Sequence, residues 1–517
     1  MVVSYLKKHL GFILFSALLL VGLFTYKTYG MSWDEKEQRG IGLISYNYLV
    51  HGDSTLRHFS NNVYGVGVEL PLVIIEKVFR MKDVRSIFWM RHGITHLFLV
   101  FGAWAFFLLI DGLYKNKLLA TLGFGMLVAM PLIYTHSFYN TKDVPFLSMY
   151  IICFWLAYRA FQKNTVGSFV MLGLGCGYLT NIRIMGILLV ACISLFFLID
   201  YIGVKKDLVK KKQIRTYFWI FLATALGTLY ITWPYLYSNP VQNFTDAFKN
   251  MSRHGWEGII LFNGRSVKST EVPWNYALTW FGITTPLIYL AAGITGIVFL
   301  IVHFFRNPGL FLTDKLLRNQ SLYVIGFFQP LVSVILFHSI IFDAWRHLYF
   351  IYPSFILMAI YGLHELFKTR MKWVVVLVIV TGIGWSGEYM ISNFPFQNIY
   401  FNVLAGKQEP EALRKRWELD YWGNSFKQAL EYIARTDTSR HITLAVSHPS
   451  VIFNRCMLPP SDSARFIFKG YENDAERADY FISGYRNHPE DYPFQAKAVY
   501  SIRVENSAIA TVFKARR

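Results

Sequence analysis

Long apolar runs alternate with short polar segments along most of this chain. A run of about 18 or more apolar residues has the length of a membrane-spanning helix. The first run is expected to remain as an anchor helix, because no pair of small residues typical of a signal-peptide cleavage site follows it. About eleven spans are expected, near residues 10–29, 92–112, 118–135, 145–161, 167–181, 184–202, 216–237, 277–304, 321–341, 347–367 and 373–391.

Positive charge collects in the short loops between these runs. The chain has 51 Lys and Arg against 32 Asp and Glu, a net charge of +19. Basic loops mark the cytoplasmic side of a membrane protein, so an odd number of spans places the N-terminus inside and the C-terminal segment outside. The charge therefore reports membrane topology, and a nucleic-acid partner is not expected.

Polar loops and the C-terminal segment then lie on the outer side. The outer loops are expected at residues 30–91, 136–144 and 238–276. From residue 393 the composition becomes charged, with strand-like runs such as ITLAVS and AVYSIRVE. We therefore expect a polytopic α-helical membrane domain at 1–392 and a small extracytoplasmic α/β domain at 393–517.

The segment SWDE places Asp34 directly after the first apolar run. An ionisable group near the membrane surface is costly unless it is solvated or paired, which favours a functional role. The alternative is structural, because Ser32 or Asp34 ahead of Glu35 would open an amphipathic helix well. Both interpretations of Asp34 stay open on these residues.

The segment HSFYNTKDVPF, residues 136–146, presents the same choice. Asp143, with a proline two positions later, could cap the next span, and Lys142 could simply extend to the membrane surface. However, His136, Asn140, Lys142 and Asp143 form a dense polar cluster between two spans. A simple connection would not need such a cluster, so we favour function.

Cations and aromatic residues complete the polar set on the outer side. Arg346 and His347 stand where a span begins and could hold a phosphate, although a surface ion pair with Asp343 is the plainer alternative. Arg183 lies among apolar residues without a neighbouring acid, so it needs an anion from elsewhere. In the third outer loop, His254 and Trp256 fit an interfacial aromatic belt or a sugar-binding surface.

Acids and cations from separate outer loops suit the transfer of a group from a lipid phosphate. A carboxylate can deprotonate an incoming hydroxyl, and a cation can stabilise charge on a departing phosphate. A nearby carboxylate also stabilises an oxocarbenium-like sugar. Asp34, Glu35 and Asp143 could bind a divalent metal ion but need not, and no cofactor is firmly indicated.

Several segments, in this order, resemble the polyprenyl-phosphate-dependent glycosyltransferases of GT-C type. The resemblance is to glycosyltransferase family 39, which includes protein mannosyltransferases and lipid A aminoarabinose transferases. Asp34–Glu35 resemble the acidic pair of that family, and NTKDVP resembles its N-x-K-D-x-P loop. VPWNYALTWFGITTPL, DAWRHLYFIYP, PFQNIYFN and DYWGNSF resemble later segments, so the similarity covers most of residues 1–430.

The resemblance implies a bacterial inner- or plasma-membrane enzyme of GT-C fold. It implies that Asp34 is the catalytic base, that Asp143 is a second active-site acid, and that one sugar passes with inversion from a polyprenyl phosphate to an acceptor hydroxyl of a protein, lipid or glycan. The candidate substrate-binding residues are Glu35, His136, Asn140, Lys142, Arg183, His254, Trp256, Arg346 and His347. The alternatives are a transporter or flippase, or a polymerase or ligase, for lipid-linked saccharides.

Overall fold

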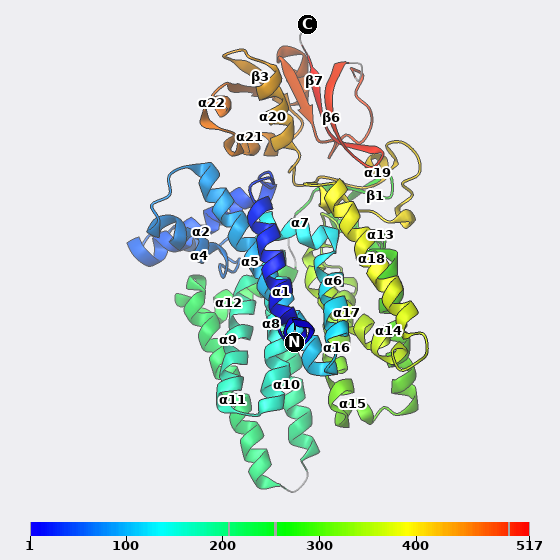
Figure 1. The fold of residues 1–517 in the computed structure, drawn as a ribbon. Helices are drawn as coiled ribbons and strands as arrows, with labels where there is room; N and C mark the ends of the chain where they lie inside the picture. The colour runs from blue at the N-terminus through cyan, green and yellow to red at the C-terminus, as the bar shows by residue number, and fades with distance from the viewer. Residues whose placement is uncertain (1, 205–206, 253–255, 495–496, 516–517) are drawn as a thin grey trace.

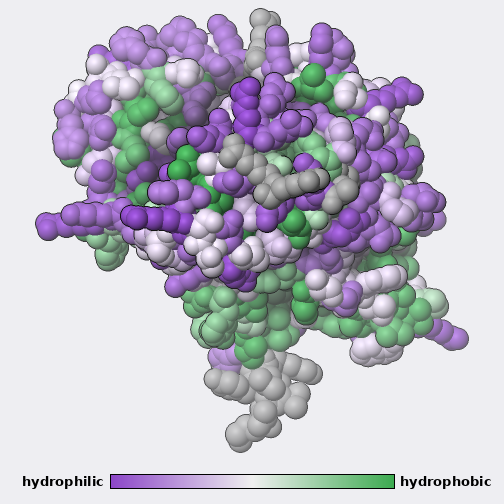
Figure 2. All heavy atoms as spheres, turned by 90° about the horizontal axis from the view of Figure 1, so that it is seen from above, coloured by the Kyte–Doolittle hydropathy of each residue, from purple (hydrophilic) through white to green (hydrophobic). Residues whose placement is uncertain are grey.

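A helical bundle carries a sheet-containing domain on one end, as the ribbon in Figure 1 shows. The computed structural model describes residues 2–204, 207–252, 256–494 and 497–515. Seen from above, the face that carries the C-terminal domain is largely hydrophilic (Figure 2). The end of the molecule that bears the sheet is therefore polar.

Seven helices of the described residues are long and apolar enough to cross a membrane. They are α5 (Val84–Tyr114), α8 (Asp143–Lys163), α10 (Gly186–Gly203), α11 (Leu208–Thr232), α14 (Leu287–Arg306), α16 (Lys315–Leu336) and α18 (Lys372–Ser392). An eighth results if α6 (Lys117–Val128) and α7 (Pro131–Tyr139), bent by 63°, form one broken span. The polytopic helical membrane fold is thus confirmed.

The expected count of about eleven spans is reached only with three further helices. They are α1 (Val2–Thr25), α9 (Val166–Ile182) and α17 (Tyr352–Leu366). Each coincides with an expected run, but α9 has 17 residues and α17 has 15. A helix this short falls below the roughly 20 residues that an untilted span needs.

The first outer loop folds into α2 (Trp33–His51), α3 (Thr55–His58) and α4 (Glu69–Val78). An ion-pair cluster fixes α4 against α5: the fully buried Arg91 pairs with Glu69, and its Nη1 lies 3.5 Å from Glu76 Oε1. Arg39 of α2 joins the same Glu76 at 2.9 Å. The start of α2 is thereby held close to the bundle.

The third outer loop is also structured. It contains α12 (Pro240–Ser252) and a hairpin of β1 (Ile259–Phe262) and β2 (Arg265–Lys268), followed by α13 (Tyr276–Thr284). The hairpin turns at Asn263 and Gly264, whose φ angles of 50° and 78° suit an Asn-Gly turn. An antiparallel bridge from Phe262 to Trp417 ties the hairpin to the C-terminal region.

The C-terminal domain is a five-stranded sheet of order β4-β3-β5-β7-β6. The strands are β3 (Ile442–Val446), β4 (Phe466–Gly470), β5 (Tyr480–Ser483), β6 (Ala498–Val504) and β7 (Ser507–Lys514). Strand β3 is parallel to β4 and β5, and β7 is antiparallel to β5 and β6. With α20 (Phe426–Thr436) beside it, the sheet confirms the expected small α/β domain, while its boundary at residues 392/393 stays a prediction.

Short elements complete the chain. The helices are α15 (Leu310–Thr313), α19 (Ala412–Arg416), α21 (Ser450–Asn454) and α22 (Pro460–Ser463). The 3-10 turns are η1 (Pro234–Tyr237), η2 (Ser269–Glu271), η3 (Arg346–Ile351), η4 (Gln397–Ile399), η5 (Val403–Ala405), η6 (Arg455–Met457) and η7 (Glu472–Arg477). Turn η3 leads directly into α17, which joins the polar end of the bundle to its core.

Gly296 of α14 and Gly362 of α17 let the two helices approach backbone to backbone. A Cβ atom at Gly296 would overlap the Met358 carbonyl, whereas one at Gly384 of α18 would meet nothing within 4 Å. We expect Gly296→Ala to destabilise the protein by about 1–3 kcal/mol through overpacking. Gly384→Ala should be neutral or slightly stabilising, and equal melting temperatures of both variants in detergent would contradict this packing.

Candidate functional site

Asp34 and Glu35 begin α2 but face different surroundings. Ser32 is the N-cap, and its backbone N–H donates to Glu35 Oε2 at 2.7 Å in a capping box. Glu35 Oε1 lies 3.0 Å from His92 Nε2, and the side chain is buried. The capping role therefore belongs to Ser32 and Glu35, and the Asp34 carboxylate, 26% exposed, lines a cavity.

Asn140 caps the start of α8, which was the structural role considered for Asp143. The Asn140 Oδ1 accepts hydrogen bonds from the backbone N–H of Asp143 at 2.8 Å and of Lys142 at 3.2 Å. Its Nδ2 donates to Asp143 Oδ2 at 2.9 Å. The carboxylate of Asp143 is thus oriented but not used by the helix end, and it is almost fully buried.

Arg346 brings the two predicted acids together. Its Nη1 lies 3.5 Å from Asp34 Oδ2 and 3.6 Å from Asp143 Oδ2, and its Nη2 lies 3.2 Å from Asp343 Oδ2. The guanidinium is only 5% exposed and Asp343 is 4% exposed. The Asp343–Arg346 contact is therefore a buried ion pair, and the surface pair considered from the sequence is wrong.

Arg183 finds its anion in Asp143. It is the C-cap of α9, its Nη1 contacts Asp143 Oδ1, and its side chain is partly exposed at the cavity wall. Asp143 therefore holds two arginines, Arg183 and Arg346, that come from distant parts of the chain. A carboxylate in this position fixes the direction in which both cations point.

Lys142 lies between α7 and α8, outside the spans, and also lines the cavity. Its ammonium sits over the Tyr64 ring, 4.1 Å from the centroid. Burial lowers the pKa of Lys142 to about 8, Asp34 opposes this shift, and Arg183 adds to it. The group is a cation at neutral pH that can lose its proton at mildly alkaline pH.

The cavity has a volume of about 540 Å³. Among the predicted site residues its wall includes Asp34, Lys142, Arg183, Trp256, Arg346 and His347. His136 lies behind this wall, fully buried, with Nδ1 3.1 Å from Asn140 Nδ2 and Nε2 3.2 Å from the Tyr421 hydroxyl. Glu35 is turned away, and His254 lies outside the described residues.

Sequence reasoning missed several residues of the wall. They are Trp33, Glu37, Tyr64, Asp343, His448, Arg486 and Asn487. Trp33 and Glu37 adjoin Asp34, and Asp343 stands in the DAWRH segment, so proximity to the motifs could have indicated them. His448, Arg486 and Asn487 come from the C-terminal domain, and no motif in the sequence marks them.

A metal site formed by Asp34, Glu35 and Asp143 would require the three carboxylates to lie around one point. Asp34 and Asp143 meet at Arg346, but Glu35 is bound to Ser32 and His92 and does not join them. In the ranges that the structure describes, no three His, Cys, Asp or Glu side chains form a metal-binding group. Asp34, Asp143 and Asp343 instead face arginines.

Comparison with known proteins gives one family match and several similar structures. Residues 84–237 match a family model described as dolichyl-phosphate-mannose-protein mannosyltransferase. ArnT from Cupriavidus metallidurans, bound to undecaprenyl phosphate, is 13% identical over 97% of both chains with a TM-score of 0.48. Archaeal AglB from Archaeoglobus fulgidus, in complex with an inhibitory peptide and a dolichol-phosphate, is 10% identical over 93% of this chain and 70% of that chain, with a TM-score of 0.49.

No curated protein matches the chain. The segment matched by the family model runs from α5 to η1 and contains His136, Asn140, Lys142, Asp143 and Arg183. The chain is a multi-pass membrane protein, and its match to the mannosyltransferase family model over residues 84–237 indicates a glycosyltransferase with a lipid-linked donor. The similarity to ArnT and AglB is too low to assign the role of any residue in those proteins to a residue of this chain.

The Arg346 guanidinium contacts three carboxylates in different directions, which a lysine ammonium cannot reproduce. We therefore expect Arg346→Lys to lower sugar transfer by about 100-fold, the size of effect seen when one preorganised donor is removed from an active site. Arg318→Lys is the matched control, because Arg318 pairs with Asp200 at 2.8 Å and does not line the cavity. Equal rates for both variants would exclude this role.

Proposed function

We propose that the enzyme transfers a single sugar, with inversion, from a polyprenyl-phosphate donor to an acceptor hydroxyl at the extracytoplasmic face of a bacterial plasma membrane. The observation that carries this proposal is the meeting of Asp34 and Asp143 at Arg346 beside one cavity. An acid, a second acid and cations around one space are the groups that such a transfer needs.

Asp34 is the proposed general base. Among the carboxylates around Arg346 it is the most exposed, at 26% against 1% for Asp143 and 4% for Asp343. An acceptor hydroxyl entering the cavity can therefore reach Asp34. The hydroxyl proton passes to Asp34 while the acceptor oxygen bonds to the anomeric carbon opposite the departing phosphate, and attack from that side inverts the configuration.

Lys142, Arg183 and Arg346 are the proposed partners of the donor phosphate. The bond from the anomeric carbon to the phosphate oxygen breaks, so the phosphate leaves with an additional negative charge. Cations already oriented by the protein stabilise that charge without reorganising. Asp143 acts in the same site by holding Arg183 and Arg346 in place.

The charge distribution supports the proposed orientation. The end of α10, the start of α11 and the short helix α15 lie at the end of the bundle opposite the sheet domain (Figure 1). Basic residues gather there, including Lys210, Lys211, Lys212, Arg306, Lys315 and Arg318. By the positive-inside rule we infer that this end is cytoplasmic, with the N-terminus inside and the cavity and the C-terminal domain outside.

Incubation of purified protein with a panel of polyprenyl-phosphate monosaccharides tests the proposal. We expect the wild type to consume one member of the panel and Asp34→Asn to consume none, because the amide cannot accept the proton. The variant should keep the melting temperature of the wild type, since Asp34 is not the helix cap. Activity of Asp34→Asn, or use of a diphosphate-linked oligosaccharide instead, would overturn the proposed reaction.

Donor binding should weaken at alkaline pH. The pKa of Lys142 is lowered to about 8, so its positive charge is present below pH 8 and is lost as the pH rises through that value. We expect the dissociation constant of a polyprenyl phosphate to rise by up to about tenfold per pH unit above 8. Lys142→Arg should remove this dependence, because arginine stays charged, and identical pH profiles for both proteins would contradict it.

A further inference from the structure

Arg486 reaches the cavity from the C-terminal domain. It lies in the connection between β5 and β6, and its side chain forms part of the cavity wall. Its Nη2 donates to Asp343 Oδ1 at 2.7 Å, and its Nη1 donates to the Tyr421 carbonyl. The sheet domain thus places a largely buried cation directly against the helical bundle.

Asp343 links this cation to the central arginine. One carboxylate oxygen binds Arg486, and the other lies 3.2 Å from Nη2 of Arg346. The backbone of Asp343 and Ala344 has φ angles of 55° and 60°, an unfavourable region for two successive non-glycine residues. Such a conformation persists only where the surroundings hold it, and the two arginines supply that restraint.

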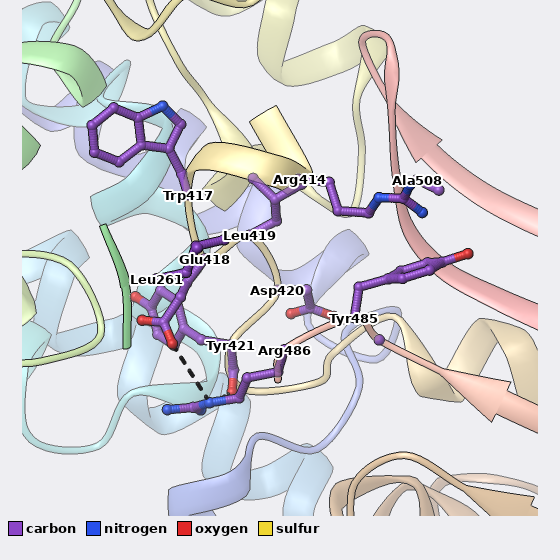
Figure 3. A pocket seen from close by; sticks show the side chains of 11 residues that line it. Leu261, Arg414, Trp417, Glu418, Leu419, Asp420, Tyr421, Tyr485, Arg486 and Ala508 are labelled. Carbon is purple, nitrogen blue, oxygen red and sulfur yellow. Dashed lines mark hydrogen bonds and ion pairs between the residues drawn. The ribbon is translucent and has the colours of Figure 1, made fainter. Parts of the chain in front are cut away.

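Glu418 lies on the other side of Arg486. Its Oε1 is 3.9 Å from Arg486 Nε, and Figure 3 shows the two side chains facing each other among the residues that join the domain to the bundle. Burial raises the pKa of Glu418 to about 8, although Arg486 lowers it. Arg486 lies nearer to Asp343, at 2.7 Å, than to Glu418, at 3.9 Å, so its charge is directed mainly to Asp343.

We propose that Arg486 is a positioning residue that fixes Arg346 through Asp343, so that the C-terminal domain completes the catalytic site. Glu418, Arg486, Asp343 and Arg346 form one continuous series of contacts that ends at Asp34 and Asp143. The inference rests on the proposed function, because it assigns Arg346 its orientation toward the general base. It adds that the orientation depends on a residue of another domain.

The test measures kcat and donor KM for full-length protein carrying Arg486→Gln, Asp343→Asn or both. We expect each single variant to lower kcat by about 10- to 100-fold with a smaller change in KM, because Lys142 and Arg183 still bind the donor phosphate when Arg346 is misoriented. The double variant should lose no more than about the larger single loss, since both changes break the same series of contacts. Losses that multiply, or an unchanged kcat in Arg486→Gln, would overturn the proposal.

Arg414→Gln is the matched control for a purely structural effect. Arg414 is an arginine of the same domain that is buried even more completely than Arg486, and its Nη2 pairs with Asp491 at 2.6 Å, away from the cavity. It should alter the melting temperature and leave kcat unchanged. If Arg486→Gln does not melt cooperatively, Arg486→Lys decides the question: a kcat at least about threefold below wild type supports positioning, and a wild-type kcat refutes it.

Asp34→Asn is measured in the same assay to separate the two proposals. If Asp34→Asn is inactive and Arg486→Gln is fully active, the positioning role fails while the proposed reaction stands. If Asp34→Asn is active, the assignment of the general base fails, and the Arg486 results then report on the domain contact alone. In that second case a lowered kcat in Arg486→Gln would still show that the C-terminal domain completes the site.

Discussion

Arg346 is a cation held almost out of contact with water, and its charge is balanced by carboxylates from three separate segments. Removing a guanidinium from water is expensive, and the cost is offset only when its anionic partners are well placed. Asp34, Asp143 and Asp343 provide those partners from the start of α2, the start of α8 and the residues before η3. The convergence of these segments is therefore a requirement of burying one charge, and it also creates the site.

The helical bundle makes this convergence practicable. The chain just after α7 and the end of α9 bring polar side chains to the start of α8, where Asn140 and Arg183 both contact Asp143. In a membrane, non-helical backbone at such helix ends is tolerated only where it is covered by protein or faces water. The cavity meets that condition, because α2 and the C-terminal domain cover it while leaving a space of about 540 Å³.

Much of this arrangement could be predicted from the sequence. Helix positions followed from apolar runs, because hydrophobic length is a local property, and the polar cluster at NTKDVP pointed to Asp143 and Lys142. Asp34 and Glu35 differ in role because Glu35 is the N3 residue of the capping box that Ser32 begins. The segment SWDE already carries this S-x-x-E pattern, and it leaves the Asp34 carboxylate to face the cavity. The sequence predicted His136 in an outer loop, but the residue lies buried in α7.

The least predictable residue is Arg486, since nothing near it in the sequence resembles a motif. Its importance arises from two long-range contacts, to Asp343 and to the Tyr421 carbonyl, that exist only once the sheet domain has docked. A buried cation at a domain contact must be satisfied by partners on both sides, so docking and the order of the cavity are coupled. A domain that merely tethered an acceptor would not need to bury a charge against Asp343, and this physical cost favours a direct part in shaping the site.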